Sequence, residues 1–493
     1  MANPEINVGE TRNQTFATTA KNAGANLARI GASWLVVLFL PPLLVRVLDK
    51  PSYATWVLIL QIGAYVALFD NGIQSAIGVF AARAQELRDR THLQRTMSNA
   101  GAILMAGAVL ALGATLLVSW QLEHVFRGIP STIAGSAQVA LVVIGVSIAI
   151  SLPFSTLAGV FLGLQMNEVN AVAGSAGKLL GAAGAAWAAW HHQGLAIMAL
   201  WIGFGNLVQS AIFYLWWRRL KLSGLIHRAH VTGTAMLEFA RFCSAMFATQ
   251  LTALLITGMD MPVVAAFDFR SAAYYAVAAT ASNMLAAPHG AIVTTLIPVA
   301  SRLRASESPE RLGQVVIRTT RYATGILCLL TLPLLPAMHP FLRLWVGSDY
   351  AAHATPLALL LIVAQFTRMT LMPYAAIGYG AGQQHRMLIS PFAEGIVNLA
   401  CSVAGAFLWG AMGVALGTLI GAFVGIGCHF AFSMSRTDAM RFGRGRLAIE
   451  GILGPVACCL PGLVLALCFQ NYLGTLAAKV GIIAGAEALA ALL

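Results

Sequence analysis

The sequence contains few charged residues. Asp, Glu, Lys and Arg make up 10% of its 493 residues, whereas hydrophobic residues make up 58%. A soluble domain usually carries about 25% charged residues, so the composition excludes the soluble classes. No connection between the apolar runs is long enough to fold as a separate domain. The chain is therefore expected to be a polytopic membrane protein.

Motifs that hold metals, nucleotides or reacting groups are also lacking. The seven cysteines all fall in apolar runs, where they are expected to be small buried residues. The histidines show no spacing typical of metal ligands, and "GYGAGQQ" from Gly378 lacks the spacing of a phosphate-binding loop. The first 26 residues are polar, so we expect no cleavable signal peptide. We expect a transporter without a bound metal or cofactor, and not an enzyme.

Apolar runs of about 20 residues, the length that crosses a bilayer, recur from end to end of the chain. They predict an all-α polytopic membrane protein with about 14 transmembrane helices. The expected spans are 27–49, 53–81, 98–120, 137–162, 168–190, 194–216, 235–257, 273–300, 319–343, 353–378, 387–408, 410–433, 447–468 and 472–491.

The net charge of +12 is unevenly distributed. Four basic clusters follow even-numbered spans: Arg83, Arg88, Arg90 and Arg95; Arg218, Arg219, Lys221 and Arg228; Arg302, Arg304, Arg311 and Arg318; Arg436, Arg441, Arg444 and Arg446. By the positive-inside rule these clusters and both termini are cytoplasmic. The basic residues predict contact with anionic lipids and disfavour nucleic acid as a partner. The short loops, as in bacterial membrane proteins, predict a location in the inner (plasma) membrane.

The two halves of the chain are related by an offset of 219 residues. At this offset Asp49, Gln165 and Trp190 fall on Asp268, Gln384 and Trp409. The offset superposes the first six spans on the next six in the same orientation, as in transporters with parallel repeats. The predicted parts are a cytoplasmic segment 1–26, an N-lobe 27–230, a C-lobe 231–446 and two extra spans in 447–493. Two such lobes suit alternating access to a cavity between them.

Several basic residues lie within or beside the predicted spans. A charge at bilayer depth costs at least about 2.5–3.5 kcal/mol, and Lys178 and Arg368 lie midway along spans 5 and 10 with no acid one turn away. We predict that they line the cavity, where they would favour an anionic ligand such as a phosphate-bearing lipid. Arg29 and Arg241 are further candidates for this lining. Snorkelling of Arg29 and a local Glu238–Arg241 pair are alternatives for these two residues.

Three other polar residues are candidates for coupling or for contacts between helices: Asp70, His289 and Glu394. Asp70 lies near mid-depth of span 2, and the 219 offset places it opposite His289. Asp70 could close a polar contact inside the N-lobe, or it could couple transport to a proton or another cation. The sequence leaves both possibilities open.

The order of residues in the first two spans resembles a known family. Asn26, Leu48-Asp49, Tyr53, Trp56 and "DNGI" from Asp70 follow the opening pattern of the polysaccharide transporters, although Ala54 stands where a glycine is usual. The later "WGAMGVALGTLIGAF" is similar to the glycine-rich twelfth helix of that family. These proteins are the O-antigen-type lipid-linked oligosaccharide flippases of the multidrug/oligosaccharidyl-lipid/polysaccharide (MOP) exporter superfamily.

The resemblance implies a two-lobed fold with a cationic cavity. It implies that an undecaprenyl-diphosphate-linked oligosaccharide moves from the cytoplasmic to the periplasmic leaflet, for lipopolysaccharide or exopolysaccharide assembly. It also implies coupling to H⁺ or Na⁺, and a polysaccharide polymerase or export machinery as partner.

Other functions stay open at this point. A drug/cation antiporter and a peptidoglycan-precursor flippase belong to the same superfamily. A membrane polymerase or glycosyltransferase is less favoured, because the longest outward loop, Gln121 to Ser136, is too short for an acceptor site.

Overall fold

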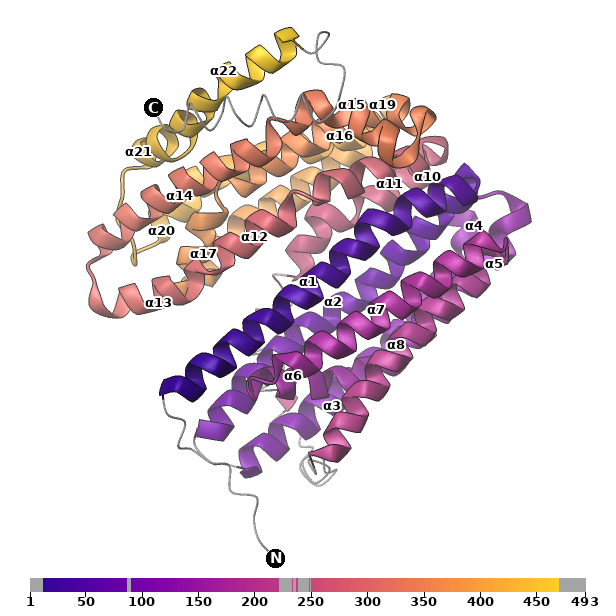
Figure 1. The fold of residues 1–493 in the computed structure, drawn as a ribbon, viewed down its shortest axis with the longest axis horizontal. Coiled ribbons are helices and arrows are strands. Elements are labelled where there is room, and N and C mark those ends of the chain that lie inside the picture. The colour runs from indigo at the N-terminus through magenta and orange to yellow at the C-terminus, as the bar shows by residue number, and fades with distance from the viewer. Residues whose placement is uncertain are drawn as a thin grey trace, which may run out of the picture. The chain divides into compact units, whose positions relative to one another are not determined.

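The computed structural model describes residues 12–86, 90–220 and 250–469, and residues 233, 236, 237 and 248 individually. All regular secondary structure within these ranges is helical. Contacts within the chain define two compact units (Figure 1). One contains residues 1–125 and 129–250, and the other contains residues 126–128 and 251–493.

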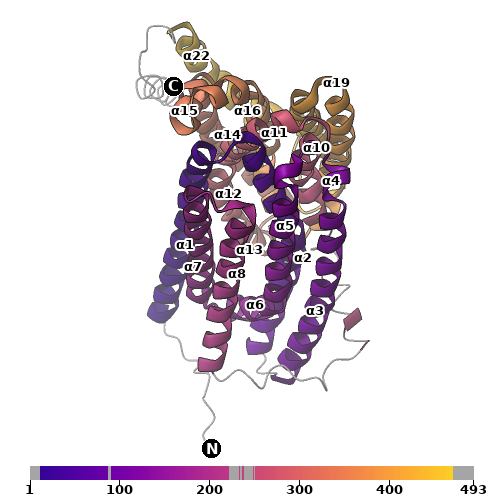
Figure 2. The same ribbon diagram turned by 90° about the vertical axis from the view of Figure 1, so that its right-hand side faces the viewer.

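The first unit is a bundle of long helices that run side by side (Figure 2). Its elements are α1 (Arg12–Val47), α2 (Lys50–Glu86), α3 (Arg90–Trp120), α4 (Leu122–Val125), α5 (Ser131–Ser151), the 3₁₀ turn η1 (Leu152–Phe154), α6 (Ser155–Gly163), α7 (Asn167–Trp190) and α8 (Gly194–Arg219). α7 packs between α1 and α8, and α5 packs against α8, α3 and α2.

Prolines have different effects in this unit. Pro153 lacks a backbone donor, and the helix changes there to the η1 turn that separates α5 from α6. α1 continues as a helix through Pro41 and Pro42, because neighbouring helices in a membrane can satisfy the carbonyls that a proline frees.

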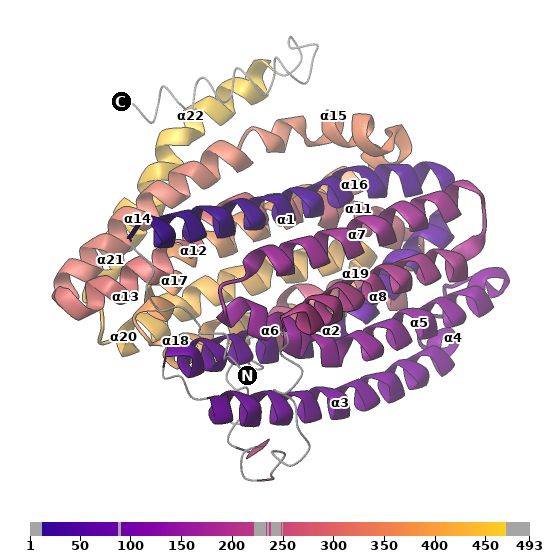
Figure 3. The same cartoon turned by 60° about the horizontal axis from the view of Figure 1, so that its bottom comes forward.

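The second unit is more segmented. Its elements are the π-helix η4 (Leu254–Gly258), α10 (Asp260–Phe267), α11 (Phe269–Asn283), α12 (Ala286–Thr294), α13 (Leu296–Ser306), α14 (Pro309–Thr331), α15 (Leu334–Val346), α16 (Ser348–Met369), α17 (Met372–Gly380), α18 (Gln384–Met387), α19 (Ile389–Cys428), the π-helix η5 (His429–Ser433), α20 (Met434–Arg436), α21 (Arg444–Arg446), the π-helix η6 (Leu447–Leu453) and α22 (Gly454–Phe469). α22 packs along α14 (Figure 3).

α19 is a hairpin of two helices. The backbone departs from helical geometry at Trp409 (φ −135°) and Gly410 (φ +56°), and a positive φ favours glycine. This turn coincides with the predicted boundary between spans 11 and 12. Asp268 fixes the turn from outside the hairpin, because its Oδ2 accepts a hydrogen bond from the Ala411 backbone nitrogen at 3.0 Å.

A ladder of glycines joins the two halves of the α19 hairpin. Gly413, Gly417, Gly421 and Gly425 are spaced four apart on its second half, and they face Gly405, Ser402, Asn398 and Glu394 on its first half. A Cβ added at Gly421 would lie 2.8 Å from the Asn398 Cβ, and one added at Gly425 would lie 2.5 Å from Glu394 Oε2. Because these glycines have no side chains, there is room to bury three polar residues of the first half against them: Ser402, Asn398 and Glu394.

The membrane character agrees with the prediction. Among the described residues, nine helices are long and apolar enough to cross a bilayer, or ten if the α14–α15 pair, bent by 43°, forms one span. The chain is thus an all-α polytopic membrane protein, as expected. The expected span 472–491 and most of the expected span 235–257 lie outside the described residues.

Candidate substrate and coupling sites

Two predicted cationic residues come together in the first unit. Lys178 on α7 donates a hydrogen bond from Nζ to Ser33 Oγ on α1 at 3.1 Å. Arg29 precedes Ser33 by four residues, which is one turn of α1, and its charge acts on Lys178. Both side chains are exposed on this unit. In the part of the chain that the structure describes, neither has a carboxylate partner within 4 Å.

The packing of α7 explains where Lys178 points. Gly177 lies against Gly205 of α8, because a Cβ at Gly177 would stand 2.6 Å from the Gly205 carbonyl oxygen. The next residue along a helix is turned by about 100°, so Lys178 leaves the α7–α8 contact and reaches α1. Two neighbouring cations without a counter-ion repel each other, and this arrangement favours an anion.

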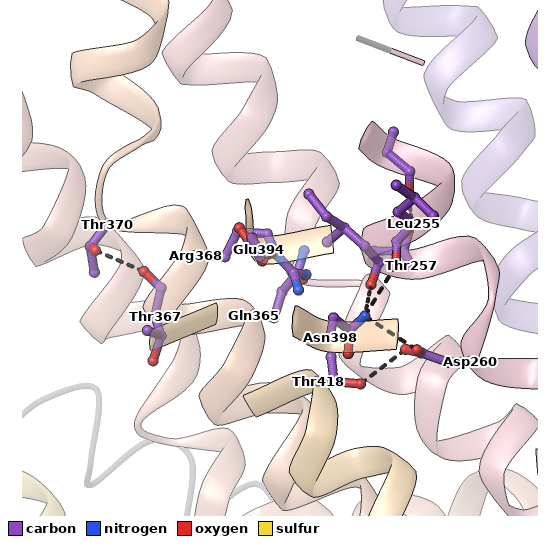
Figure 4. A network of polar contacts seen from close by, with 12 residues as sticks. Leu255, Thr257, Asp260, Gln365, Thr367, Arg368, Thr370, Glu394, Asn398 and Thr418 are labelled. Carbon is purple, nitrogen blue, oxygen red and sulfur yellow. Dashed lines mark hydrogen bonds and ion pairs between the residues drawn. The ribbon is translucent and has the colours of Figure 1, made fainter. Parts of the chain in front are cut away.

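Arg368 lies in the second unit and is already paired. Its Nε lies 2.6 Å from Glu394 Oε1, and its Nη1 donates to Gln365 Oε1 at 2.8 Å (Figure 4). The exposed fractions of the two charged side chains are 18% and 8%. Sequence reasoning missed this pair because its members are 26 residues apart and on different helices.

Asp260 begins α10 and was not among the predicted site residues. It is buried, with an exposed fraction of 7%. Thr418 Oγ1 donates to its Oδ2 at 3.0 Å, and Asn398 Nδ2 donates to its Oδ1 at 3.4 Å (Figure 4). The predicted span ended at residue 257, which placed Asp260 in a loop. Apolar residues on both sides, "MDMPVVAAF", were the signal that could have placed it in a helix.

The π-helix η4 connects Asp260 to the α19 hairpin. A π-turn breaks the regular register of backbone hydrogen bonds, and here Asn398 Nδ2 donates to the carbonyl oxygens of Ile256 at 2.7 Å and Leu255 at 3.4 Å. Ser402 Oγ in turn donates to Asn398 Oδ1 at 3.1 Å. Asn398 therefore links the buried Asp260 to the backbone carbonyls of η4 and to Ser402.

The charges around Asp260 do not balance. Asp260 and Glu394 are two buried carboxylates, and Arg368 is the basic side chain whose charge acts on Asp260. The three groups sum to one negative charge. Tyr275 is 1% exposed, and its hydroxyl interacts with Asp260 and Thr418. A buried charge needs a counter-charge, so one additional positive charge would neutralise this cluster.

The chemistry of the donors limits the ion that this cluster could take. Hard cations prefer oxygen ligands, and the side chains that contact Asp260 among the described residues are the Thr418 hydroxyl and the Asn398 amide, both of which also contain an oxygen atom. The described residues contain no group of three or more His, Cys, Asp or Glu that could hold a metal ion.

The remaining predicted residues are placed as follows. His289 on α12 is 1% exposed, and its ring interacts with the backbone of Ala323 on α14. Asp70 belongs to α2, but its side chain lies outside what the structure describes, as does Arg241. The predicted roles of these three residues stay predictions.

An apolar groove of about 640 Å³ lies on α19 beside η4. It is lined by Leu255, Ile396, Leu399, Ala400, Val403, Ala404 and Phe407. These positions follow one face of the helix, and Glu394 and Asn398 lie on the opposite face by helical periodicity. The groove is thus separate from the polar cluster.

Comparison with known proteins identifies the fold through similar solved structures. No protein-family model and no curated protein sequence matches the chain. The structure of the lipid II flippase MurJ in an inward closed conformation is similar over 95% of this chain and 97% of MurJ, with a TM-score of 0.66 at 14% identity. The fold is that of the MOP-superfamily transporters.

Two MATE transporter structures have a similar fold. An inward-facing MATE family transporter of the MOP superfamily is similar over 83% of this chain and 97% of its own, with a TM-score of 0.64 at 14% identity. A mutant of the Vibrio cholerae MATE transporter VcmN is similar over 86% and 98%, with a TM-score of 0.61 at 13% identity. A fold hosts several functions, so the function must be argued from the residues of this chain.

Proposed function

We propose that this protein is a flippase for a lipid-linked anionic oligosaccharide. It would move an undecaprenyl-diphosphate-linked glycan from the cytoplasmic to the periplasmic leaflet by alternating access. The observation that carries the proposal is the exposed Arg29–Lys178 pair, which has no carboxylate partner among the described residues. Two unneutralised cations in predicted spans are costly unless they serve a ligand.

The two cations suit a diphosphate. Arg29 offers a planar fork that can bind a phosphate through two hydrogen bonds, and Lys178 offers a point charge. The Ser33 hydroxyl orients the Lys178 ammonium at 3.1 Å. A lipid carrier fits because its head group needs a polar path, whereas its hydrocarbon tail can stay in the bilayer.

The alternatives predict different surroundings. A drug/cation antiporter needs acid where its ligand binds, and the first unit offers a basic pair there instead. A peptidoglycan-precursor flippase would use the same two cations, since its substrate carries the same diphosphate. The likeness to the polysaccharide transporters in the first two spans favours the export of lipopolysaccharide or exopolysaccharide units over the peptidoglycan precursor.

The cellular setting is part of the proposal. It comprises the bacterial inner membrane, both termini in the cytoplasm, no enzymatic step, and a polysaccharide polymerase or export machinery as partner.

Transport would be coupled to Na⁺ or H⁺ at Asp260. A bound cation would supply the positive charge that Asp260, Glu394 and Arg368 lack together. Asp260 would provide the carboxylate, and Asn398 and Thr418 would turn their oxygens toward the ion. The side chains that now donate to Asp260 would accept the ion after a rotation, because the hydroxyl and the amide each contain an oxygen atom with free lone pairs.

The test is glycan export in a deletion strain complemented with variants. Arg29→Ala and Lys178→Ala should each reduce export at least tenfold, with lipid-linked glycan accumulating in the inner leaflet. Arg219→Ala is the matched control, because it removes an exposed arginine at the end of α8, away from the pair. Normal export by the Arg29→Ala/Lys178→Ala double variant, at normal protein level, would refute the proposal.

The sugar of the accumulated lipid separates the candidates. A cell-surface polysaccharide unit supports the leading function, and a peptidoglycan precursor supports the alternative flippase. Loss of drug resistance without any accumulated lipid would point to the antiporter.

A further inference from the structure

α14 has one buried face and one exposed face that is basic. The buried face packs against α17, η6 and α22. Residues spaced three or four apart lie on the same side of a helix, and the exposed side chains of α14 follow this spacing. They are Arg311, Gln314, Arg318, Arg321 and Tyr322. These side chains form one continuous surface, the α14 basic stripe.

The acids on α14 and on its neighbour η6 are paired with arginines outside the stripe. Glu310 Oε1 on α14 lies 3.4 Å from Arg441 Nη1. Glu450 Oε1 on η6 lies 2.7 Å from Arg446 Nε. Neither carboxylate is therefore left to neutralise the α14 basic stripe.

The arginines of the stripe lack a counter-charge. In the described ranges no carboxylate lies within 4 Å of Arg311, Arg318 or Arg321, and this includes the exposed Glu307 just before α14. Arg311 Nη1 donates to the neutral Gln314 Oε1 at 3.3 Å. Arg318 and Arg321 are three residues apart, so their like charges repel each other across one turn. An anion held between them would relieve this repulsion.

The position of the stripe along the chain points to a lipid head group. The expected span begins at residue 319, so Arg318, Arg321 and Tyr322 lie at the edge of the bilayer that the predicted topology makes cytoplasmic. Tyr322 is 70% exposed, and tyrosine is enriched at the level of the lipid head groups. A soluble acidic protein could reach Arg311, whereas the side chains at the start of the span face the membrane.

The same face of α14 becomes apolar one turn further into the span. Gly325 and Leu329 follow Arg318 and Tyr322 on this face by helical periodicity. A Cβ added at Gly325 would meet nothing within 4 Å, so this glycine makes no close contact with a described neighbouring element. Glycine is less favourable than alanine inside a helix. The open space at Gly325 has room for the hydrocarbon chain of a lipid whose head group lies on the arginines.

We propose that the α14 basic stripe binds an anionic phospholipid of the cytoplasmic leaflet. The phosphate lies between Arg318 and Arg321, because a guanidinium group can donate two hydrogen bonds to phosphate oxygens. Tyr322 donates from its hydroxyl to the head group, and one hydrocarbon chain passes over Gly325. The stripe shares no residue with the proposed transport site of the first unit, so its ligand is a resident membrane lipid and not the transported glycan.

Native mass spectrometry of the purified full chain in a neutral detergent tests this site. The protein is titrated with phosphatidylglycerol, which is anionic, and with phosphatidylcholine, which has no net charge. The unsubstituted protein should prefer phosphatidylglycerol, and equal retention of the two lipids would overturn the proposal. Arg318→Gln/Arg321→Gln should lower the affinity for phosphatidylglycerol by about 25-fold, or about fivefold for each arginine. Gly325→Leu should lower it by about threefold, because leucine would occupy the space of the chain.

Arg270→Gln/Arg343→Gln is the matched control for charge, because it removes two exposed arginines from α11 and α15 of the same unit. Gly427→Leu is the control for the glycine, since a Cβ at Gly427 would also meet nothing within 4 Å. Both controls should bind phosphatidylglycerol normally. Equal losses in the two arginine double variants would overturn the site, and normal binding by Gly325→Leu would overturn the placement of the chain. Displacement of the lipid by an equal concentration of inorganic phosphate would show that the stripe binds a free anion, and would overturn the lipid as its ligand.

Discussion

Gly425→Ala tests the glycine ladder at the place where it meets the ion pair. The added Cβ would lie 2.5 Å from Glu394 Oε2 and 3.0 Å from Glu394 Cβ. An ordinary contact is about 3.5–4 Å, so the carboxylate must move by about 1 Å. Overpacking of this kind costs about 1–3 kcal/mol. If Glu394 is pushed off Arg368, the cost rises toward the about 3–5 kcal/mol of a broken buried pair.

Gly427→Ala provides the reference for this measurement. Gly427 lies two residues further along the same helix, and a Cβ there would meet nothing within 4 Å. Both substitutions gain the same helix propensity, about 1 kcal/mol in favour of Ala. The difference between the two variants therefore isolates the clash, and it should be at least about 1 kcal/mol.

The assay is equilibrium unfolding of the purified variants in mixed micelles, followed by circular dichroism. Gly425→Ala should unfold at a lower denaturant fraction than Gly427→Ala. Equal stabilities would show that Glu394 can withdraw from Gly425 at no cost, and would refute the idea that the ladder holds the carboxylate in place.

Three further predictions concern other parts of the chain. Asp268→Ala should lower the free energy of unfolding by about 0.5–2 kcal/mol, because Asp268 caps the second half of the α19 hairpin, and Asp268→Asn should recover most of the loss. Asp70→Asn should export glycan normally while Asp70→Ala fails; failure of both, at normal protein level, would favour coupling through Asp70. Single cysteines at four basic positions should react with an impermeant thiol reagent only from the cytoplasm, and labelling from the periplasm would contradict the topology. These positions are Arg90, Arg219, Arg304 and Arg441.

The sequence predicted the helical class and many helix ends. The spans expected at 168–190 and 194–216 correspond to α7 and α8, and the turn between them contains His192 and Gly194 with positive φ. The apolar runs in this region end where turn residues begin, so hydropathy alone locates the boundary. Near residue 257 it failed, because the helical segment continues from the π-helix η4 into α10 across Gly258 and Asp260, which hydropathy marks as an end.

The contacts between helices were harder to predict. Hydropathy places Arg368 and Glu394 at bilayer depth, but it contains no information on which faces of two spans meet. The ladder was partly visible, since glycines recur every four residues from Gly413 to Gly425. A tight turn at Trp409 and Gly410 sets the antiparallel register, and that register opposes Gly425 to Glu394. To predict the contact between Gly425 and Glu394, one therefore needs the position of the turn as well as the four-residue spacing of the glycines.

The α19 hairpin has a mechanical consequence. Backbone meets backbone at Gly405 and Gly413, and side chains of one half fill the notches of the other down to Gly425. Sliding the halves past each other would drive Asn398 and Glu394 into the side chains that separate those notches. The two halves of the hairpin must therefore move together as one rigid body. Any bending of this unit during a transport cycle is left to the breaks elsewhere, such as those at Leu285 and Thr295 on either side of α12.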